Sequence, residues 1–441
     1  MPVVLKESFL EPRKSTRLFV SLALIILAIV LLLLPGILRE DKLPIGDKSY
    51  YHLRMSENEG RDELSFSGRN NELSPGWNLI LKFVPMNIAL VVFGLITVLL
   101  LYLNLKSLNL SQRFLATGFF VLSPAFIYLF NVGERFGAAF MFSLLILYFL
   151  IKEKYILSGI SFVFLPFFDY GISIFTLILA GMYWLYKNKK NSLLYGLLAL
   201  TSLSLLIIGK WDKSLISDLG AKVGISIFGL VFVIFCLILL WNKKNFLKLY
   251  GVLALLIILS LKLEFGIFYL ATFLSILLSL CFISLYSVRW ESKSVRDITL
   301  LLVLCGLLFS GLSYANRISQ DMPDENLFKA LNTLPDGSVV LSGIEYGHWI
   351  SYSGKKNVWD TFTKKEDFKE RKEDLVKLLD SKDPFLSRDI LDKYKVDFIL
   401  IDEKLMKSWQ EKGIFYLPSY NNEDFRLIYD DERIKIWRRF S

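Results

Sequence analysis

The chain has 441 residues, of which 54% are apolar, and its mean hydropathy is +0.47. Long apolar runs recur over roughly the first 316 residues, separated by short polar loops. This pattern excludes an ordinary soluble protein and predicts a polytopic helical membrane protein, because about 20 apolar residues cross the hydrocarbon core. The net charge of +9 lies in the short loops, so it favours contact with anionic lipid headgroups rather than nucleic acid.

We predict a bundle of about eleven membrane spans, none of which contains Asp, Glu, Lys, Arg or His. That absence argues against an ion-coupled carrier or proton pump. The region 156–186 contains Pro166 and Asp169 and could be one element or two, but two spans keep Lys152 and Lys187 on the same side of the membrane. The predicted spans are 18–38, 84–103, 114–130, 136–151, 156–168, 170–186, 193–209, 223–241, 249–261, 265–288 and 298–315.

The distribution of lysine and arginine orients this bundle. Up to residue 316, the N-terminal tail and every second loop hold 17 basic and 5 acidic residues, whereas the opposite loops hold 12 basic and 13 acidic ones. Cytoplasmic loops carry the basic excess, so we predict a cytoplasmic N-terminus in a multi-pass protein of the cell membrane. Residues 1–316 then form the transmembrane domain, with a first external loop at 39–83, and residues 317–441 form an extracytoplasmic domain.

The C-terminal segment has the pattern of a small α/β domain. All three cysteines lie in predicted spans, which leaves none for a disulfide or a cysteine metal site in this domain. Short apolar runs predict strands at 338–341 and 397–401, and a hairpin that joins 427–429 to 434–437. Polar helical patterns predict helices at 366–380 and 387–394, and Ser387 is the expected N-terminal cap of the second helix.

The densest cluster of chemically active residues follows the first span. Within eight residues it contains Asp47, Tyr50, Tyr51, His52 and Arg54. A carboxylate beside aromatic and basic side chains at a bilayer surface suits a divalent cation and a lipid-linked phosphate. The same residue types also form interfacial anchoring belts, so a structural role is the alternative.

Two further external loops carry carboxylates. Glu134 precedes Arg135 in a very short turn, and Glu264 separates two apolar runs. Three carboxylates from different loops, Asp47, Glu134 and Glu264, can hold Mg²⁺ or Mn²⁺, because these hard cations take oxygen ligands and leave positions for phosphate. Arg54 or Arg135 could pair with phosphate oxygens, and the alternative for the second loop is a local Glu–Arg pair.

A second cluster lies in the C-terminal domain, after its first predicted strand. It contains Glu345, Tyr346, His348 and Trp349, with glycines that predict a turn. Tyr346 and Trp349 could form an apolar wall for a substrate, or could pack inside the domain. The chain has two histidines, His52 and His348, so a three-histidine metal site is excluded.

These motifs resemble those of archaeal oligosaccharyltransferase catalytic subunits and related GT-C membrane glycosyltransferases. Residues 47–54 resemble the first-external-loop motif of this family. Residues 345–350, which follow Leu-Pro-Asp-Gly at 334–337, resemble the end of its Trp-Trp-Asp-Tyr-Gly motif. The order of anchor, acidic loops and external domain also matches, so the resemblance covers most of the chain and implies a GT-C-like bundle.

The resemblance implies that Asp47 is a metal ligand and the carboxylate that activates the acceptor, while Glu134 and Glu264 match acidic positions of later loops. It also implies a polyprenyl- or dolichyl-phosphate-linked sugar donor and a peptide or sugar acceptor. The expected catalytic residues are Asp47, Glu264, His52 and Arg54; the expected substrate contacts are Tyr50, Tyr51, Arg135, Glu345, Tyr346, His348 and Trp349.

The chain departs from the family pattern at three points. Gly343 and Ile344 replace the two tryptophans of the external motif, with Glu345 in place of aspartate. Glu134 stands alone where the family has two acids, and the predicted spans are fewer than is typical. We therefore expect a divergent lipid-linked sugar transferase; the alternatives are a true protein N-glycosylating enzyme and a non-catalytic lipid-sugar-binding or scaffold protein.

Overall fold

The chain forms two compact units, Met1–Glu40 with Pro85–Gln320 (the helical unit) and Asp41–Val84 with Asp321–Ser441 (the sheet unit). Most of the predicted first external loop therefore belongs with the C-terminal segment. The computed structural model describes residues 14–39, 41–58, 60–65, 68–70, 74–188, 215–219, 221–240, 247–363, 365–381, 383–403, 424–431 and 433–440.

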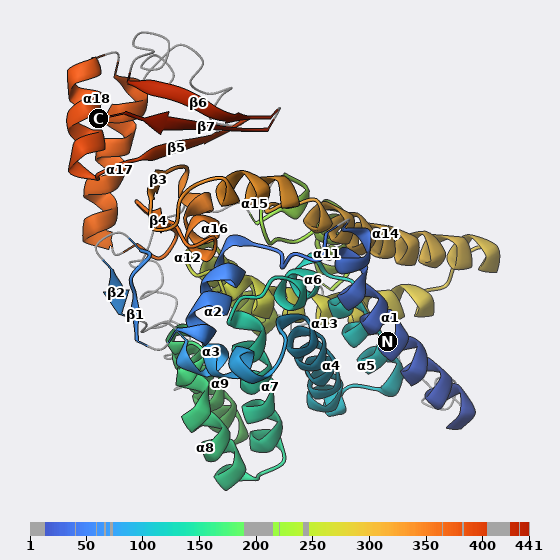
Figure 1. The fold of residues 1–441 in the computed structure, drawn as a ribbon. Coiled ribbons are helices and arrows are strands. Elements are labelled where there is room, and N and C mark those ends of the chain that lie inside the picture. Colours follow the sequence, from blue (N-terminus) through green and yellow to red (C-terminus); the bar gives the residue numbers. More distant parts are fainter. Residues whose placement is uncertain are drawn as a thin grey trace. The chain divides into compact units, whose positions relative to one another are not determined.

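The helical unit is built from apolar helices that overlap the predicted spans, with 114–130 divided between two helices (Figure 1). The predicted span 193–209 lies outside the described residues. Short 3₁₀ turns, η2 (Leu105–Ser107), η3 (Leu165–Phe167) and η4 (Ser217–Leu219), lie between some of them. The helices are α1 (Lys14–Leu38), α4 (Met86–Asn104), α5 (Leu110–Val121), α6 (Pro124–Asn131), α7 (Phe136–Ile151), α8 (Tyr155–Phe164), α9 (Tyr170–Lys187), α11 (Ile227–Leu240), α12 (Leu247–Lys262), α13 (Gly266–Ser287) and α14 (Lys293–Ser319).

Length and apolar composition qualify four of the described helices, α1, α4, α13 and α14, to cross a membrane singly. Helices α5 and α6 together make a fifth candidate, bent by 60°. Others, such as α7 and α12, are apolar but have only 10–17 residues. The chain is thus a helical membrane protein by these criteria, and the predicted number of about eleven spans is not confirmed.

The predicted span at 114–130 is two helices, α5 and α6, because the helix breaks before Pro124. Proline lacks the backbone N–H needed to continue α5 and is favoured at the first position of a new helix. The Ser123 side chain caps α6 by accepting a hydrogen bond from the backbone N–H of Phe126 at 3.2 Å. Both signals are visible in the sequence.

The region 156–186 forms two helices, as the charge pattern favoured. Pro166 lies in η3, and Asp169 begins α9 by accepting a hydrogen bond from the backbone N–H of Ile172 at 2.8 Å. Asp169 is therefore a helix cap at the junction between two helices and not a charge inside one long span.

The sheet unit contains a mixed five-stranded sheet of order β4-β3-β5-β7-β6, in which β3 is parallel to β4 and β5 and β7 is antiparallel to β5 and β6. A separate hairpin joins β1 (Arg61–Asp62) to β2 (Arg69–Asn70). The sheet strands are β3 (Val339–Leu341), β4 (Lys356–Asn357), β5 (Phe398–Asp402), β6 (Phe425–Asp430) and β7 (Ile434–Arg439). The helices are α2 (Asp47–Glu57), α3 (Pro75–Phe83), α15 (Glu325–Asn332), α16 (Gly347–Tyr352), α17 (Lys365–Asp380) and α18 (Pro384–Lys393), with a 3₁₀ turn η6 (Ile344–Tyr346).

Helices cover both faces of this sheet. Ile399 and Ile401 of β5 pack in one core with residues of α17 and α18, whereas Phe398 and Leu400 pack in the other with residues of α2, α15 and α16. Side chains alternate between the faces of a strand, so the unbroken apolar run of β5 is the pattern of a strand covered on both sides. Figure 1 shows α17 and α18 beside the strands.

The α/β prediction for the C-terminal segment agrees with this sheet unit, including the hairpin of β6 and β7. One boundary is wrong: α18 begins at Pro384, and Asp383 caps it by accepting a hydrogen bond from the backbone N–H of Phe385 at 2.9 Å. Ser387, the predicted cap, is buried inside the helix and donates to the Asp383 carbonyl at 3.0 Å.

The predicted orientation is tested by cysteine labelling at two exposed positions, Lys154 between α7 and α8 and Asp336, whose side chain is 88% exposed. A membrane-impermeant maleimide should label Asp336→Cys in intact cells, and Lys154→Cys only after permeabilisation, because basic loops stay cytoplasmic. The parent should carry Cys305→Ser, since Cys305 is exposed. Labelling of both positions from the same side would contradict the predicted topology.

Candidate functional site

The first predicted motif is a helix, α2, where the sequence suggested a loop. It follows Gly46, whose φ of 88° is a backbone conformation that glycine adopts without strain. Asp47 is the first residue of α2, where a carboxylate is favoured by the helix dipole. Asp47 is 5% exposed, and Tyr50 and Tyr51 are fully buried. The motif therefore lies in the interior of the sheet unit.

The aromatic residues of the two motifs meet in one hydrophobic core. Tyr50 belongs to the same buried cluster as Tyr346 and Trp349, whose rings are perpendicular with centroids 5.1 Å apart. The Tyr346 hydroxyl donates a hydrogen bond to Asp402 at 3.1 Å. Burial of Tyr346 is the main reason that the pKa of its hydroxyl is raised, and the negative charge of Asp402 raises it further. These packing contacts correspond to the alternative that the sequence left open, whereas Glu345 is exposed.

His52 connects α2 to α3. Its Nδ1 lies 2.8 Å from the side-chain oxygen of Asn78, and both residues are buried. An amide oxygen only accepts hydrogen bonds, so Nδ1 of His52 is the donor in this contact. The centroids of the His52 and Tyr51 rings are 5.2 Å apart in an edge-to-face arrangement, so the buried imidazole packs against Tyr51.

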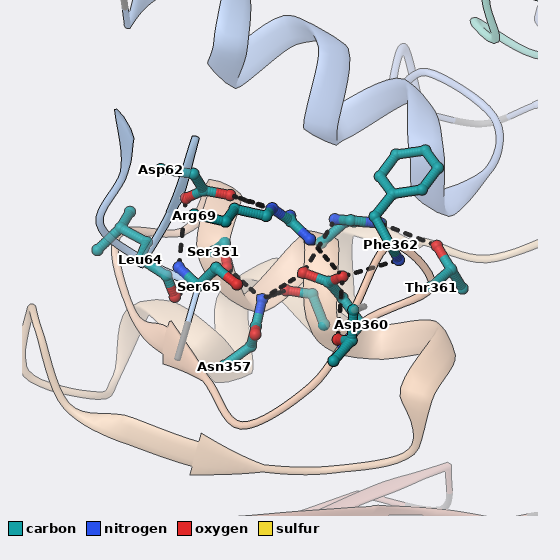
Figure 2. A network of polar contacts seen from close by, with 12 residues as sticks. Asp62, Leu64, Ser65, Arg69, Ser351, Asn357, Asp360, Thr361 and Phe362 are labelled. Carbon is teal, nitrogen blue, oxygen red and sulfur yellow. Dashed lines mark hydrogen bonds and ion pairs between the residues drawn. The ribbon is translucent and has the colours of Figure 1, made fainter. Parts of the chain in front are cut away.

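Two arginines and two aspartates form a buried ion-pair network. Figure 2 shows the Arg69 side chain with Asp62 and Asp360. Arg54 donates to both carboxylate oxygens of Asp62, and Arg69 contacts Asp62 at 3.0 Å and Asp360 at 2.7 Å. Both carboxylates are fully buried. Removing one member would leave an unpaired buried charge, at a cost of about 3–5 kcal/mol. The network ties α2 and the β1–β2 hairpin to the segment after β4.

Asp360 is the acceptor that organises this segment. It accepts from Arg69, from the backbone N–H of Phe362 at 2.9 Å and from the Asn357 amide at 3.2 Å. Burial alone would raise the pKa of the Asp360 carboxyl. The positive charge that His348 carries when protonated, the charge and hydrogen bond of Arg69 and the Phe362 N–H together lower the pKa to well below its usual range. Asp360 is therefore a permanent carboxylate at neutral pH.

Asp47 is joined to the second motif through Thr361. The Thr361 hydroxyl donates to Oδ2 of Asp47 at 3.0 Å, and Nε2 of His348 lies 2.9 Å from the same hydroxyl. Burial lowers the pKa of the His348 ring, so the ring is neutral at neutral pH. Gly347 permits this approach, because a Cβ there would lie 2.2 Å from the carbonyl oxygen of Trp359.

The other two predicted acids lie in the helical unit, Glu134 just before α7 and Glu264 just before α13. Glu134 is buried and accepts from the Tyr128 hydroxyl at 2.9 Å. Arg135 forms an ion pair with Asp169 at 2.9 Å, which joins the residues just before α7 and α9. The alternative predicted from the sequence was an ion pair between Arg135 and its neighbour Glu134. Glu264 is exposed in the turn between α12 and α13. The residue after it, Phe265, packs 6.1 Å from Phe175 of α9.

The predicted metal ligands are divided between the units: Asp47 belongs to the sheet unit, and Glu134 and Glu264 belong to the helical unit. Across the described part of the chain, no group of three or more His, Cys, Asp or Glu side chains is arranged to hold a metal ion. Among the residues that the structure describes, neither unit alone provides a complete set of donors for a metal ion.

Sequence reasoning missed four residues that build the site: Asp62, Arg69, Asp360 and Thr361. Their contacts with the first motif join residues that are up to 314 positions apart in the sequence. Asp62 and Arg69 stand among other charged residues, and no local pattern separates them from solvated ones. The polar Asp360-Thr361 pair after the apolar Val358-Trp359 was the one available signal.

We expect the unfolding temperature of the whole protein to fall as the pH decreases from about 7.5 to about 5.5, partly through His348. The folded-state pKa of this ring is below 6.5, so the unfolded chain takes up a proton that the folded chain does not. Stability is therefore lost as the pH falls through about 6.5, by at most about 1.4 kcal/mol per pH unit.

His348→Gln should show a weaker pH dependence, because the amide can donate to Thr361 without titrating. Unfolding followed by tryptophan fluorescence in detergent would measure both proteins. Equal slopes for the two would contradict a buried neutral histidine.

No protein-family model matches this chain, and no curated protein matches it by sequence. Solved structures of an archaeal oligosaccharyltransferase do match it in fold. The Archaeoglobus fulgidus enzyme tethered to an acceptor peptide containing the NVT sequon covers 97% of this chain and 74% of its own, with a TM-score of 0.58 at 12% identity. The apo form covers 88% and 70%, with a TM-score of 0.57 at 12% identity.

AglB from the same organism, in complex with an inhibitory peptide and a dolichol-phosphate, covers 91% of this chain and 72% of its own. Its TM-score is 0.54 at 11% identity. At such identity the similarity concerns the fold. The chain therefore has an oligosaccharyltransferase-like fold, as the sequence motifs implied.

Proposed function

We propose that this protein is a membrane glycosyltransferase that moves a sugar or oligosaccharide from a polyprenyl-(pyro)phosphate donor to an acceptor on the outer face of the membrane. The observation that carries the proposal is the position of Asp47: a buried carboxylate at the start of α2, bound by the Thr361 hydroxyl, in an oligosaccharyltransferase-like fold. A fold alone does not define a reaction, so the site must carry the argument.

The chemistry required of Asp47 is modest. The bond between the sugar and the lipid phosphate breaks, a bond from the acceptor oxygen or nitrogen to the sugar carbon forms, and the lipid phosphate leaves with the bonding electrons. Asp47 would accept a hydrogen bond from the O–H or N–H of the acceptor, increase its nucleophilicity and take up its proton as the new bond forms, which is the role of a positioned general base. The structural neighbours were solved with an acceptor peptide or a dolichol-phosphate, which supports these two substrate classes.

Mg²⁺ or Mn²⁺ remains part of the proposal through Asp47, Glu134 and Glu264. A bound divalent cation would offset the charge of the departing phosphate. Donor consumption by purified protein, measured with polyprenyl-linked sugars with Mn²⁺ or with a chelator, tests this directly. Equal rates under both conditions would remove the metal from the proposal.

Asp47→Ala and Asp47→Asn should each reduce transfer more than a hundredfold, a loss of about 3 kcal/mol of transition-state stabilisation. The Asn variant keeps an oxygen that can accept from Thr361, so its fold should persist even if the Ala variant is destabilised. The measurement is the donor-consumption rate at saturating substrate, with unfolding temperatures recorded in parallel.

Asp389→Ala is the matched control, because Asp389 is exposed on α18 of the same unit. It should retain the wild-type rate. If Asp47→Asn keeps more than half of the wild-type rate, the catalytic assignment is wrong and the non-catalytic scaffold becomes the better hypothesis.

Acceptor choice separates the general proposal from a true protein N-glycosylating enzyme. Strong selection for a hydroxyl requires a site whose polar groups stay unpaired without it. Gly343 and Ile344 stand where the resembled family has two tryptophans, and Ile344 packs against the core that contains Trp359. That packing supports a site without the aromatic wall.

We therefore expect Asn-x-Thr peptides to be preferred over Asn-x-Ala by much less than about a hundredfold. Both peptides and a sugar acceptor should be compared with one donor. Exclusive transfer to Asn-x-Thr would contradict this expectation and favour protein N-glycosylation.

A further inference from the structure

Two side chains of the C-terminal segment form a hydrogen-bonded chain that ends on Asp47. Nε2 of His348 lies 2.9 Å from Oγ1 of Thr361, and that hydroxyl donates to Oδ2 of Asp47 over 3.0 Å. His348 is fully buried, Asp47 is 5% exposed, and Thr361 is partly buried. No water is needed to connect the three groups at these distances.

The chemistry of the groups fixes the direction of this chain. A hydroxyl has one proton, and Thr361 gives it to the Asp47 carboxylate, so Thr361 accepts from His348. The neutral ring must then carry its proton on Nε2. The other nitrogen, Nδ1, is buried without a hydrogen-bond partner among the described residues and lies 3.7 Å from Oδ2 of Asp360, beyond hydrogen-bonding distance.

Rigid neighbours hold both donors in place. Asp360, directly before Thr361, binds Arg69 and the backbone N–H of Phe362, which fixes the turn that presents the hydroxyl. The Phe362 ring lies 5.0 Å from the His348 ring and 4.8 Å from the Tyr51 ring. The imidazole is thereby confined beside α2.

We propose that His348 and Thr361 are positioning residues for Asp47. They set the orientation of its carboxylate by a directed hydrogen-bond chain, His348 to Thr361 to Asp47, so that the C-terminal segment controls a carboxylate 314 positions earlier. The consequence for rate rests on the proposed transfer reaction. The hydrogen-bond chain itself does not, and it can be observed without any substrate.

Nitrogen NMR of the full-length protein in detergent is the direct test, because the chain has two histidines. With ¹⁵N-labelled histidine, the spectrum contains two imidazoles, and His52→Gln assigns them. At neutral pH the His348 ring should be protonated on Nε2 and unprotonated on Nδ1. Thr361→Val removes the hydroxyl while keeping the shape, so it should shift the His348 Nε2 signal.

The same variants provide the kinetic test. Thr361→Val should lower kcat about tenfold, the loss of one hydrogen bond to a charged group, with little change in the KM of the donor. Thr361→Ser restores the hydroxyl and should restore both the signal and the rate. Thr333→Val is the matched control, because Thr333 is exposed at the end of α15 in the same unit and its hydroxyl donates to the Ala330 carbonyl, away from the His348–Asp47 chain. Thr361→Ala is a second probe if the valine variant unfolds.

The outcomes separate the two proposals. A His348 ring protonated on Nδ1, or unchanged His348 signals in both Thr361→Val and Thr361→Ala, overturns the hydrogen-bond chain regardless of enzymatic activity. Changed signals with a wild-type rate overturn the positioning role. The expected signals in a protein that transfers no sugar support the chain and reject the proposed function.

Discussion

The sheet unit depends on the guanidinium of Arg69, which binds two carboxylates from distant parts of the chain. Asp62 is 7 positions away and Asp360 is 291 positions away. Both carboxylates are fully buried, and the Arg69 side chain is 13% exposed. A buried charge is tolerated only with its counter-charge, so the β1–β2 hairpin and the segment after β4 must fold together. Burial of the network makes this coupling obligatory.

The geometry around Asp47 follows from that coupling. The Arg69 guanidinium also lies 4.9 Å from the Tyr51 ring of α2, so the same group contacts the helix that begins with Asp47. The backbone N–H of Asn357 donates to the carbonyl of Leu64 at 3.1 Å, which adds a backbone link between the two segments. Thr361 meets Asp47 because Asp360, directly before it in the chain, is held by Arg69 and by the backbone N–H of Phe362. A motif that looks local in the sequence thus takes its shape from a segment near the C-terminus.

Local signals explain which parts of the fold were predictable. Apolar runs located the helices, and the continuous apolar run of β5 located a strand covered on both faces. The break at Pro124 and the cap at Asp383 were equally local, and the sequence rules for helix starts identify both. The buried role of Asp360 was not predictable, because its partner Arg69 is one of 51 basic residues and nothing near either residue indicates the pair. Tyr346 and Trp349 illustrate the same limit, since an aromatic residue near glycines has the same local pattern in a core and in a binding site.

Exposure distinguishes the two arginines that the sequence suggested for phosphate recognition. The Arg54 side chain is 6% exposed and donates through both terminal nitrogens to Asp62, so a phosphate would have to displace a fully buried carboxylate. Arg135 is 22% exposed and contacts Asp169 through Nε. A guanidinium has five N–H donors, so a contact through Nε leaves its terminal nitrogens able to bind a further anion. Of the two, Arg135 is the better candidate for the proposed phosphate contact, whereas Arg54 neutralises Asp62 inside the sheet unit.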